Sequence, residues 1–172
     1  MIEIRQLNAI EALPYLAALA GVLMDCVEGG ASVGFMAPLA RASAEAFFAK
    51  VIDSVRQGDR ILLVAFDDSR LVGSVQIVTA TPLNQPHRAD IAKLLVLRSA
   101  RGQGVAARLM EQVEEASRVA GKTLLVLDTV TGSVAEKLYL RLGWTAAGVI
   151  PRYAMFPDGA WCDTTIFWKQ LT

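Results

Sequence analysis

A short segment in the second half of the chain combines glycines with arginines in a pattern that suits phosphate binding. Residues 101–106 read Arg-Gly-Gln-Gly-Val-Ala, follow the apolar run that ends at Leu95-Val96, and open a stretch of helical periodicity that contains Arg108. The first N–H groups of a helix have no partners within it, and the helix dipole adds partial positive charge there. Glycines at 102 and 104 let the main chain approach an anion without an intervening Cβ. The segment therefore predicts a phosphate site, although a loop that only turns the chain would also use glycine.

The same segment also fits the fingerprint of a dinucleotide-binding fold. Gly102-x-Gly104-x-x-Ala107 has the required spacing, and Asp128 ends the next expected strand. However, the Rossmann arrangement places this fingerprint after the first strand of a repeated parallel unit. Here an antiparallel hairpin is expected before it, and the 65 residues after Ala107 are too few for a second half. We therefore do not favour the dinucleotide interpretation.

Hydrophobic periodicity predicts the elements that position this segment. Alternating apolar residues favour strands, whereas an apolar residue at every third or fourth position favours a helix. Strands are expected over residues 2–6, 61–66, 71–78, 89–96, 124–127, 146–156 and 164–170. With helices in between, the order β-α-α-β-β-β-α-β-α-β-β predicts an α/β fold. We expect one mixed sheet with helices on its faces, in a single domain over residues 1–172.

Capping residues mark the ends of the expected helices. The first helix runs from about residue 12 to 27, and the second begins near Ser43 as N-cap and stops at Gly58. The third starts at residue 105 and ends at Gly121. The fourth is capped by Ser133 and runs through residue 142, with Val134, Leu138 and Leu142 as its apolar row.

The composition excludes several classes of function. Seventeen basic and seventeen acidic residues cancel, so no overall field attracts nucleic acid or an anionic membrane. The apolar share of 53% would suit a homodimer interface, yet no apolar run approaches the ~18 residues of a membrane span. Two cysteines far apart and a single histidine predict no metal site. Residues 1–6 match neither a signal peptide nor a transit peptide, so we expect a cytoplasmic protein.

Two separate segments together resemble the GNAT family of N-acetyltransferases. The first is Arg-x-x-Gly-x-Ala at 101–106, preceded by Leu95-Val96; the second contains Leu138-Tyr139 and then Leu142-Gly143-Trp144. In this family the glycine segment holds the pyrophosphate of acetyl-CoA. The resemblance thus implies acetyl-CoA as co-substrate and a mostly antiparallel sheet of about seven strands flanked by about four helices. It assigns cofactor contacts to Leu95, Val96, Arg101, Gly102, Gln103, Gly104, Val105, Ala106, Ala107, Arg108 and Ser133.

The chain departs from the usual family pattern at two places. Val105-Ala106 stands where isoleucine-glycine or leucine-glycine is usual, and Trp144 stands where phenylalanine is frequent. Val105-Ala106 is a permitted small variant of the family pattern.

Three further blocks resemble the branch of this family that confers resistance to tabtoxin by acetylating its β-lactam moiety. They cover residues 29–36, 97–102 and 127–136. The first block lies outside the cofactor segment, so the resemblance implies a shared acceptor side with Gly30, Ser32, Phe35 and Asp90. It also implies a small-molecule amine, such as tabtoxinine-β-lactam, as acceptor. Related members act on different amines, and a rigid loop packed on the core is the alternative for residues 29–36.

Transfer of an acetyl group from a thioester to an amine needs a base, an oxyanion contact and a proton donor. Asp128, at the end of a central strand, is our candidate for the base, directly or through water, and Asp90 is the second choice. A carboxylate before a helix is also a common N-cap, so both interpretations of Asp128 stay open. The N–H of Val96 is expected to contact the oxyanion where its strand separates from the strand that ends at Asp128.

The resemblance places Tyr139 as the proton donor. A phenol with a pKa near ~10 is a weaker acid than a thiol near ~8.5, so it stays protonated at neutral pH and can protonate the departing thiolate. In an arbitrary helix, a tyrosine beside Leu138 would simply pack in the core.

Two other functions stay open at this point. The acceptor would be a protein N-terminus or a lysine if the groove were wide and lined with acidic residues. A non-catalytic sensor would bind the acyl-CoA and report through a dimer interface.

Overall fold

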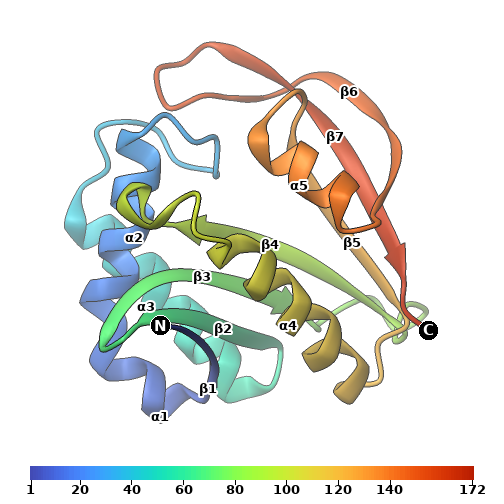
Figure 1. The fold of residues 1–172 in the computed structure, drawn as a ribbon, viewed down its shortest axis with the longest axis horizontal. Coiled ribbons are helices and arrows are strands. Elements are labelled where there is room, and N and C mark those ends of the chain that lie inside the picture. The colour runs from blue at the N-terminus through green and yellow to red at the C-terminus, as the bar shows by residue number, and fades with distance from the viewer.

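The computed structural model describes all 172 residues and contains one seven-stranded sheet with helices on both faces (Figure 1). The strands are β1 (Ile2–Leu7), β2 (Arg60–Asp67), β3 (Arg70–Val78), β4 (Arg88–Val96), β5 (Leu124–Val130), β6 (Thr145–Met155) and β7 (Trp161–Gln170). The helices are α1 (Ala9–Ala12), α2 (Leu16–Glu28), α3 (Arg41–Gln57), α4 (Val105–Val119) and α5 (Val134–Arg141), with the 3-10 turns η1 (Leu13–Tyr15) and η2 (Arg98–Ala100). Since α1, η1 and α2 follow one another directly, the helical segments number four, and the predicted order of elements is confirmed.

The strands lie in the order β1-β2-β3-β4-β5-β7-β6. All neighbouring pairs are antiparallel except β4 and β5, which the crossover through α4 makes parallel. This arrangement confirms the mixed, mostly antiparallel sheet that the resemblance implied.

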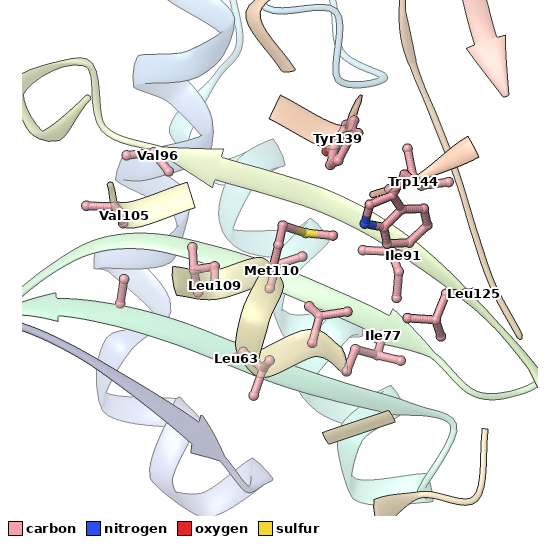
Figure 2. Packing of buried hydrophobic residues seen from close by; sticks show 14 of the residues in the cluster. Leu63, Ile77, Ile91, Val96, Val105, Leu109, Met110, Leu125, Tyr139 and Trp144 are labelled. Carbon is pink, nitrogen blue, oxygen red and sulfur yellow. The ribbon is translucent and has the colours of Figure 1, made fainter. Parts of the chain in front are cut away.

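Two hydrophobic clusters fill the two faces of the sheet. On one face, Leu109 of α4 and Leu125 of β5 belong to the same cluster, and both side chains are fully buried (Figure 2). On the other face, Leu23 of α2 and Phe48 of α3 cover Val64 of β2. The sheet is therefore held between α1–α3 on one side and α4 and α5 on the other.

The helix boundaries follow local capping chemistry, with two differences from the sequence prediction. Gly58 ends α3 in the left-handed conformation and Ser133 caps α5, as predicted. However, α3 begins at Arg41, so Ser43 lies inside its first turn and caps nothing. Val134 is 82% exposed and does not belong to the apolar row of α5, because the first turn of that helix projects beyond the core.

β5 is longer than predicted. Its antiparallel pairing with β7 continues to Val130, three residues past the predicted end at Leu127. The side chain of Asp128 therefore stands on an extended strand and not in the loop before α5. The N-cap of that helix is Ser133, so the N-cap interpretation of Asp128 is wrong.

One helical segment has the length and hydropathy of a membrane span. Within the 20-residue segment Ala9–Glu28, an 18-residue window reaches a mean hydropathy of 1.6, although the sequence analysis expected no such stretch. A core helix of a soluble protein meets the same criterion, and Leu19, Leu23 and Val27 of this segment are buried against α3 and the sheet. Burial in the core accounts for part of this hydropathy, because 39% of the apolar window is buried.

Candidate active site

The centre of the sheet opens between β4 and β5. The two strands pair over three positions only, from Arg88 with Leu124 to Asp90 with Val126. Beyond that point β4 follows β3 and β5 follows β7, and the ribbons diverge (Figure 1). We call the facing edges of residues 91–96 and 127–130 the β4–β5 splay.

The main chain at Val96 points into the splay. Leu97 N–H donates to the Val72 carbonyl on β3 at 2.9 Å, and neighbouring residues of a strand direct their N–H groups to opposite edges. The N–H of Val96 is therefore directed away from β3 and towards β5. This is the direction that the predicted oxyanion contact requires.

The glycine segment forms an anion-binding helix start. Gly102 and Gly104 both have φ of 77°, in the left-handed region where glycine is favoured, and Gly104 is the N-cap of α4. The first helical bond runs from Arg108 N–H to the Gly104 carbonyl, so the N–H groups of Val105, Ala106 and Ala107 have no partner within the helix. No acidic side chain occupies the first turn. The dipole of this 15-residue helix thus adds to a cradle that fits a phosphate.

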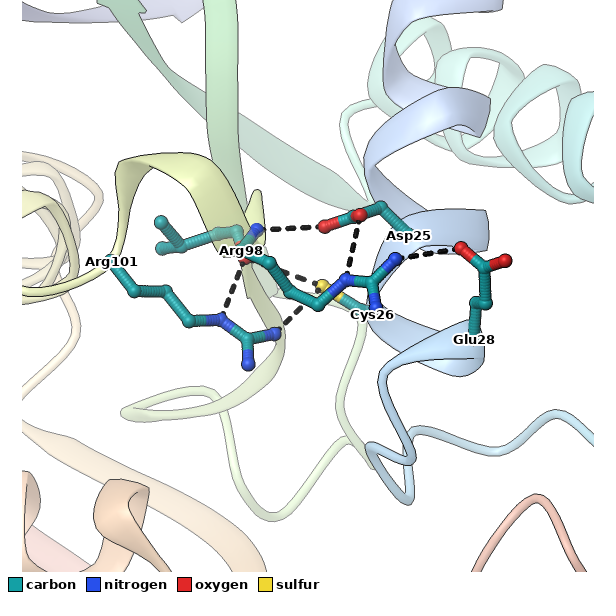
Figure 3. Close-up of polar contacts among 6 residues, drawn as sticks. Asp25, Cys26, Glu28, Arg98 and Arg101 are labelled. Atoms are coloured by element: carbon teal, nitrogen blue, oxygen red, sulfur yellow. Dashed lines mark hydrogen bonds and ion pairs between the residues drawn. The ribbon is translucent and has the colours of Figure 1, made fainter.

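The two arginines of the segment bond to other parts of the chain. Arg101 Nε donates to the Val96 carbonyl at 3.2 Å, and the guanidinium also lies 3.7 Å from Cys26 Sγ (Figure 3). Arg108 donates to the Ile2 carbonyl at 3.1 Å. The free main-chain N–H groups at the start of α4 are therefore the donors that the structure shows for the cradle, and the cofactor contacts of the two arginines stay predictions. The Ser133 hydroxyl likewise accepts from Glu136 N–H as a helix cap.

Cys26 has a basic neighbour that the sequence did not reveal. Burial raises the pKa of its thiol, and Arg101 only partly opposes this effect. The thiol also donates to the Val96 carbonyl at 3.5 Å. The sulfur therefore stays protonated and serves to hold Arg101 and the end of β4.

Tyr139 is buried at the edge of the splay. Its ring packs against Trp144 and Phe167 at centroid distances of 6.0 and 5.9 Å (Figure 2). Burial raises the pKa of its phenol, and the negative charge of Asp128 raises it further. The hydroxyl makes no hydrogen bond within the chain. It is still accessible to solvent, unlike the unpaired side-chain atoms that are fully buried. It is a protonated donor left free for another partner.

The two candidate bases occupy different positions. Asp128 is exposed on β5 beyond the last β4–β5 pair, and its charge is felt by both Tyr139 and Lys93. Asp90 lies where β4 and β5 are still paired, and its carboxylate is held by Arg88. The structure thus brings Asp128 to Tyr139 and keeps Asp90 apart from them.

The loop between α2 and α3 is fastened to the β6–β7 hairpin. The Ser32 hydroxyl donates to the Met155 carbonyl at 2.7 Å, and Ala37 N–H donates to the Pro157 carbonyl at 3.1 Å. Phe35 packs edge-on against Phe47 of α3 at 5.2 Å. Gly30 begins this loop with φ of 85°. The loop therefore bridges the two sides of the sheet beside the splay.

An ion-pair network ties the end of α2 to the start of the glycine segment. Asp25 accepts from the backbone N–H and the Nε of Arg98 at 2.7 and 2.9 Å, and Glu28 accepts from the same guanidinium at 2.7 Å (Figure 3). Burial tends to raise the pKa of Asp25, but the bonds from Arg98 outweigh it and lower the pKa. The sequence analysis missed this network because its members lie 70 or more residues apart.

Lys93 is a second residue that the sequence analysis missed. It lies on β4 at the splay with a positive φ of 54°, and burial lowers the pKa of its ammonium. A lone lysine inside the apolar run 89–96 was the available signal.

The family assignment follows from comparison with known proteins. Residues 32–144 match the model of the acetyltransferase (GNAT) family, which includes both β4 and the glycine segment. The chain belongs to this family.

Individual relatives agree with this assignment. An uncharacterized N-acetyltransferase encoded between hisH and hisA in Azospirillum brasilense is 36% identical over 106 residues, which are 60% of this chain and 61% of that protein. YncA of Salmonella typhimurium, assigned as an acetyltransferase and solved with its cofactor acetyl-CoA, has a TM-score of 0.79 at 18% identity, covering 99% of this chain and 94% of its own. A ribosomal-protein-alanine N-acetyltransferase from Brucella melitensis has a TM-score of 0.82 at 22% identity, covering 98% and 99%.

The structural likenesses support the fold and leave the acceptor open. At 18% and 22% identity they do not extend to the residues that would contact an acceptor. No group of three or more histidine, cysteine or acidic side chains that could hold a metal is present.

Proposed function

We propose that this protein transfers an acetyl group from acetyl-CoA directly to the primary amine of a small molecule. The observation that carries the proposal is the buried Tyr139 at the splay, whose hydroxyl bonds to no group in the chain; burial raises the pKa of this phenol, and the charge of Asp128 nearby raises it further. A base and a protonated acid thus stand together at the point where two strands separate. The cradle at Gly104, which follows the end of β4 in the chain, fits the phosphates of the cofactor.

In this proposal, each step of the transfer is assigned to one group of the protein. Asp128 takes the proton from the acceptor amine, whose nitrogen then attacks the thioester carbonyl carbon. Val96 N–H stabilises the negative charge that develops on the carbonyl oxygen. Tyr139 donates its proton to the sulfur as the carbon–sulfur bond breaks, and the second proton that the attacking nitrogen loses returns to the phenolate oxygen. The products are the acetamide and the free thiol of CoA.

We further propose that the acceptor is small and resembles an amino acid, with tabtoxinine-β-lactam as the compound to test. The hydrogen bonds of Ser32 and Ala37 to the β6–β7 hairpin fasten a loop beside the splay, and a polypeptide acceptor would need that side to be open. The charges that act on Lys93 at the splay are one acidic group, Asp128, and one basic group, Arg60, which does not favour a lysine side chain as acceptor. The corresponding biological role would be toxin resistance in the cytoplasm.

Thiol release from acetyl-CoA tests the acceptor class. The panel contains tabtoxinine-β-lactam, the free L-amino acids, a polyamine, and peptides with a free N-terminus or a lysine. We expect turnover on amino-acid-like small molecules to exceed turnover on peptides, after subtraction of hydrolysis without acceptor. Turnover restricted to peptides would support a protein acetyltransferase instead. Cofactor binding without turnover on any amine would favour the sensor.

A further inference from the structure

A β-bulge on β4 aims Lys93 out of the regular pattern of the strand. Ser74 pairs with Leu95 and Gln76 with Ala92, so Lys93 and Leu94 stand opposite the single residue Val75. The positive φ of Lys93 is part of this bulge. Bulges of this kind redirect side chains, and they are frequent next to active sites.

The Lys93 ammonium is half-buried and has no counter-ion in contact. It makes no hydrogen bond or ion pair in the structure, and it lies 6.0 Å from the centre of the Phe47 ring. A Cβ placed on Gly34 would stand 3.6 Å from Nζ, so the α2–α3 loop passes directly beside it. A cation that is partly removed from water and left unpaired is costly to the fold.

The positive charge around Lys93 is not neutralised by any anion in contact with it. Arg60 of β2 repels it, and Asp128 of β5 attracts it across the splay. Asp90, three residues earlier on β4, is already held by Arg88. Buried next to this position, Gln76 Nε2 and Arg60 Nε are donors without partners, which adds positive potential to this side.

We infer that Lys93 binds a carboxylate of the acceptor, so that the acceptor is an α-amino acid or a close analogue. An amino acid carries an amine and a carboxylate on one carbon. Asp128 faces the amine from β5, and Lys93 faces the carboxylate from β4. The two sides of the splay therefore present opposite charges in the order that such a zwitterion needs. This inference rests on the proposed acetyltransferase function, and it names the acceptor class and the residue that selects it.

Matched pairs of L-amino acids and their carboxamides test the inference. The amide changes the basicity of the amine as well as the charge, so the quantity to compare is the acid-to-amide ratio of kcat/KM in each variant. We expect Lys93→Met to lower this ratio by about 10- to 100-fold, through a higher KM for the acid, because a charged hydrogen bond is lost. Lys93→Arg should keep most of the ratio.

Lys50→Met is the matched control, because Lys50 is an exposed lysine on α3 and its loss changes the net charge equally. It should leave the ratio unchanged, and the KM for acetyl-CoA should be the same in all variants. An unchanged acid-to-amide ratio in Lys93→Met, with transfer still occurring, would overturn the role of Lys93 and leave the acetyltransferase proposal standing. Absence of transfer to every amine by the wild-type protein would instead overturn the proposed function.

Discussion

Asp128 and Tyr139 derive their proposed roles from different environments. Asp128 is exposed at the splay, whereas Tyr139 is buried with its hydroxyl unpaired. Burial disfavours the phenolate, and the nearby carboxylate disfavours it further. The phenol of Tyr139 therefore stays protonated at neutral pH, as a proton donor requires.

Replacement of Asp128 by asparagine should give a deficit that depends on pH. We expect kcat/KM to fall by about 100-fold near neutral pH, because the acceptor amine loses its base. The deficit should shrink as the pH rises, since a growing fraction of the amine is then neutral without help. Initial rates across the pH range measure this, with Asp90→Asn as the control. A deficit of equal size at every pH would contradict the role of Asp128 as base.

Tyr139 should make the fold sensitive to alkali. Its folded pKa is raised, so its contribution to stability is complete below the unfolded pKa near ~10 and is lost as the pH rises above that value. Phenolate absorbance followed with circular dichroism should show one of the three tyrosines ionising only as the chain unfolds. Tyr139→Phe should remove that step and raise the pH of alkaline unfolding. Ionisation of Tyr139 in the intact fold below pH ~10 would contradict the expectation.

Sequence reasoning identified residues whose roles come from local pattern and missed those that depend on distant partners. Asp128 and the glycines at 102 and 104 stand out by type and spacing. The ion pair of Arg98 with Asp25 joins elements 73 residues apart, and nothing local announces it. The bulge at Lys93 arises from the register between β3 and β4, which the sequence does not display.

The start of α4 is the element on which the proposed cofactor binding depends. Gly104 has φ of 77° and Gly121, just past the other end of the same helix, has φ of 72°. A Cβ at either position would meet no atom within 4 Å. Both glycines thus adopt a positive φ, at opposite ends of one helix. Only Gly104 is next to the proposed phosphates.

Alanine substitutions at these two glycines separate stability from binding. Each should lower the free energy of unfolding by about 1 kcal/mol, because alanine is strained at positive φ. Only Gly104→Ala should weaken acetyl-CoA binding, since its Cβ stands where the main chain approaches the anion. Thermal unfolding and calorimetric titration measure the two effects. Equal affinity in both variants would place the cofactor phosphates elsewhere.

The expected elements were found because their periodicity was strong, and their ends were less certain because tertiary pairing decides them. β5 continues past Leu127 because β7 offers partners as far as Val130. Val134 fits a helical apolar row, yet nothing covers the first turn of α5. Ser43 has a side chain suited to an N-cap, but the N-cap position of α3 is Ala40, whose backbone is extended.

The arrangement of the whole sheet lets one opening serve both proposed ligands. β4 and β5 are the only parallel pair, and each is held by an antiparallel neighbour on its other edge. β4 and β5 can therefore diverge from each other while each stays paired with its antiparallel neighbour. The glycine cradle lies on the side of α4, and Lys93 faces the α2–α3 loop, so the proposed cofactor and acceptor reach the splay from opposite sides.

The far edge of the sheet bears on the expected homodimer. Apolar side chains on the β6–β7 hairpin are exposed, among them Ile150, Tyr153, Trp161 and Trp168. They account for part of the apolar excess noted in the composition. The homodimer stays a prediction, as does the cytoplasmic location.

The most direct measurement is the turnover number of Tyr139→Phe beside its affinity for acetyl-CoA. Tyr153→Phe is the control, because Tyr153 is an exposed tyrosine on β6 that loses the same hydroxyl. We predict that kcat falls by about 100-fold in Tyr139→Phe, with acetyl-CoA affinity and stability close to wild type, since the hydroxyl bonds to no group in the chain. Wild-type turnover in Tyr139→Phe would contradict the acid role of this tyrosine. Tight acetyl-CoA binding by a wild-type protein that never releases thiol would contradict acetyl transfer itself.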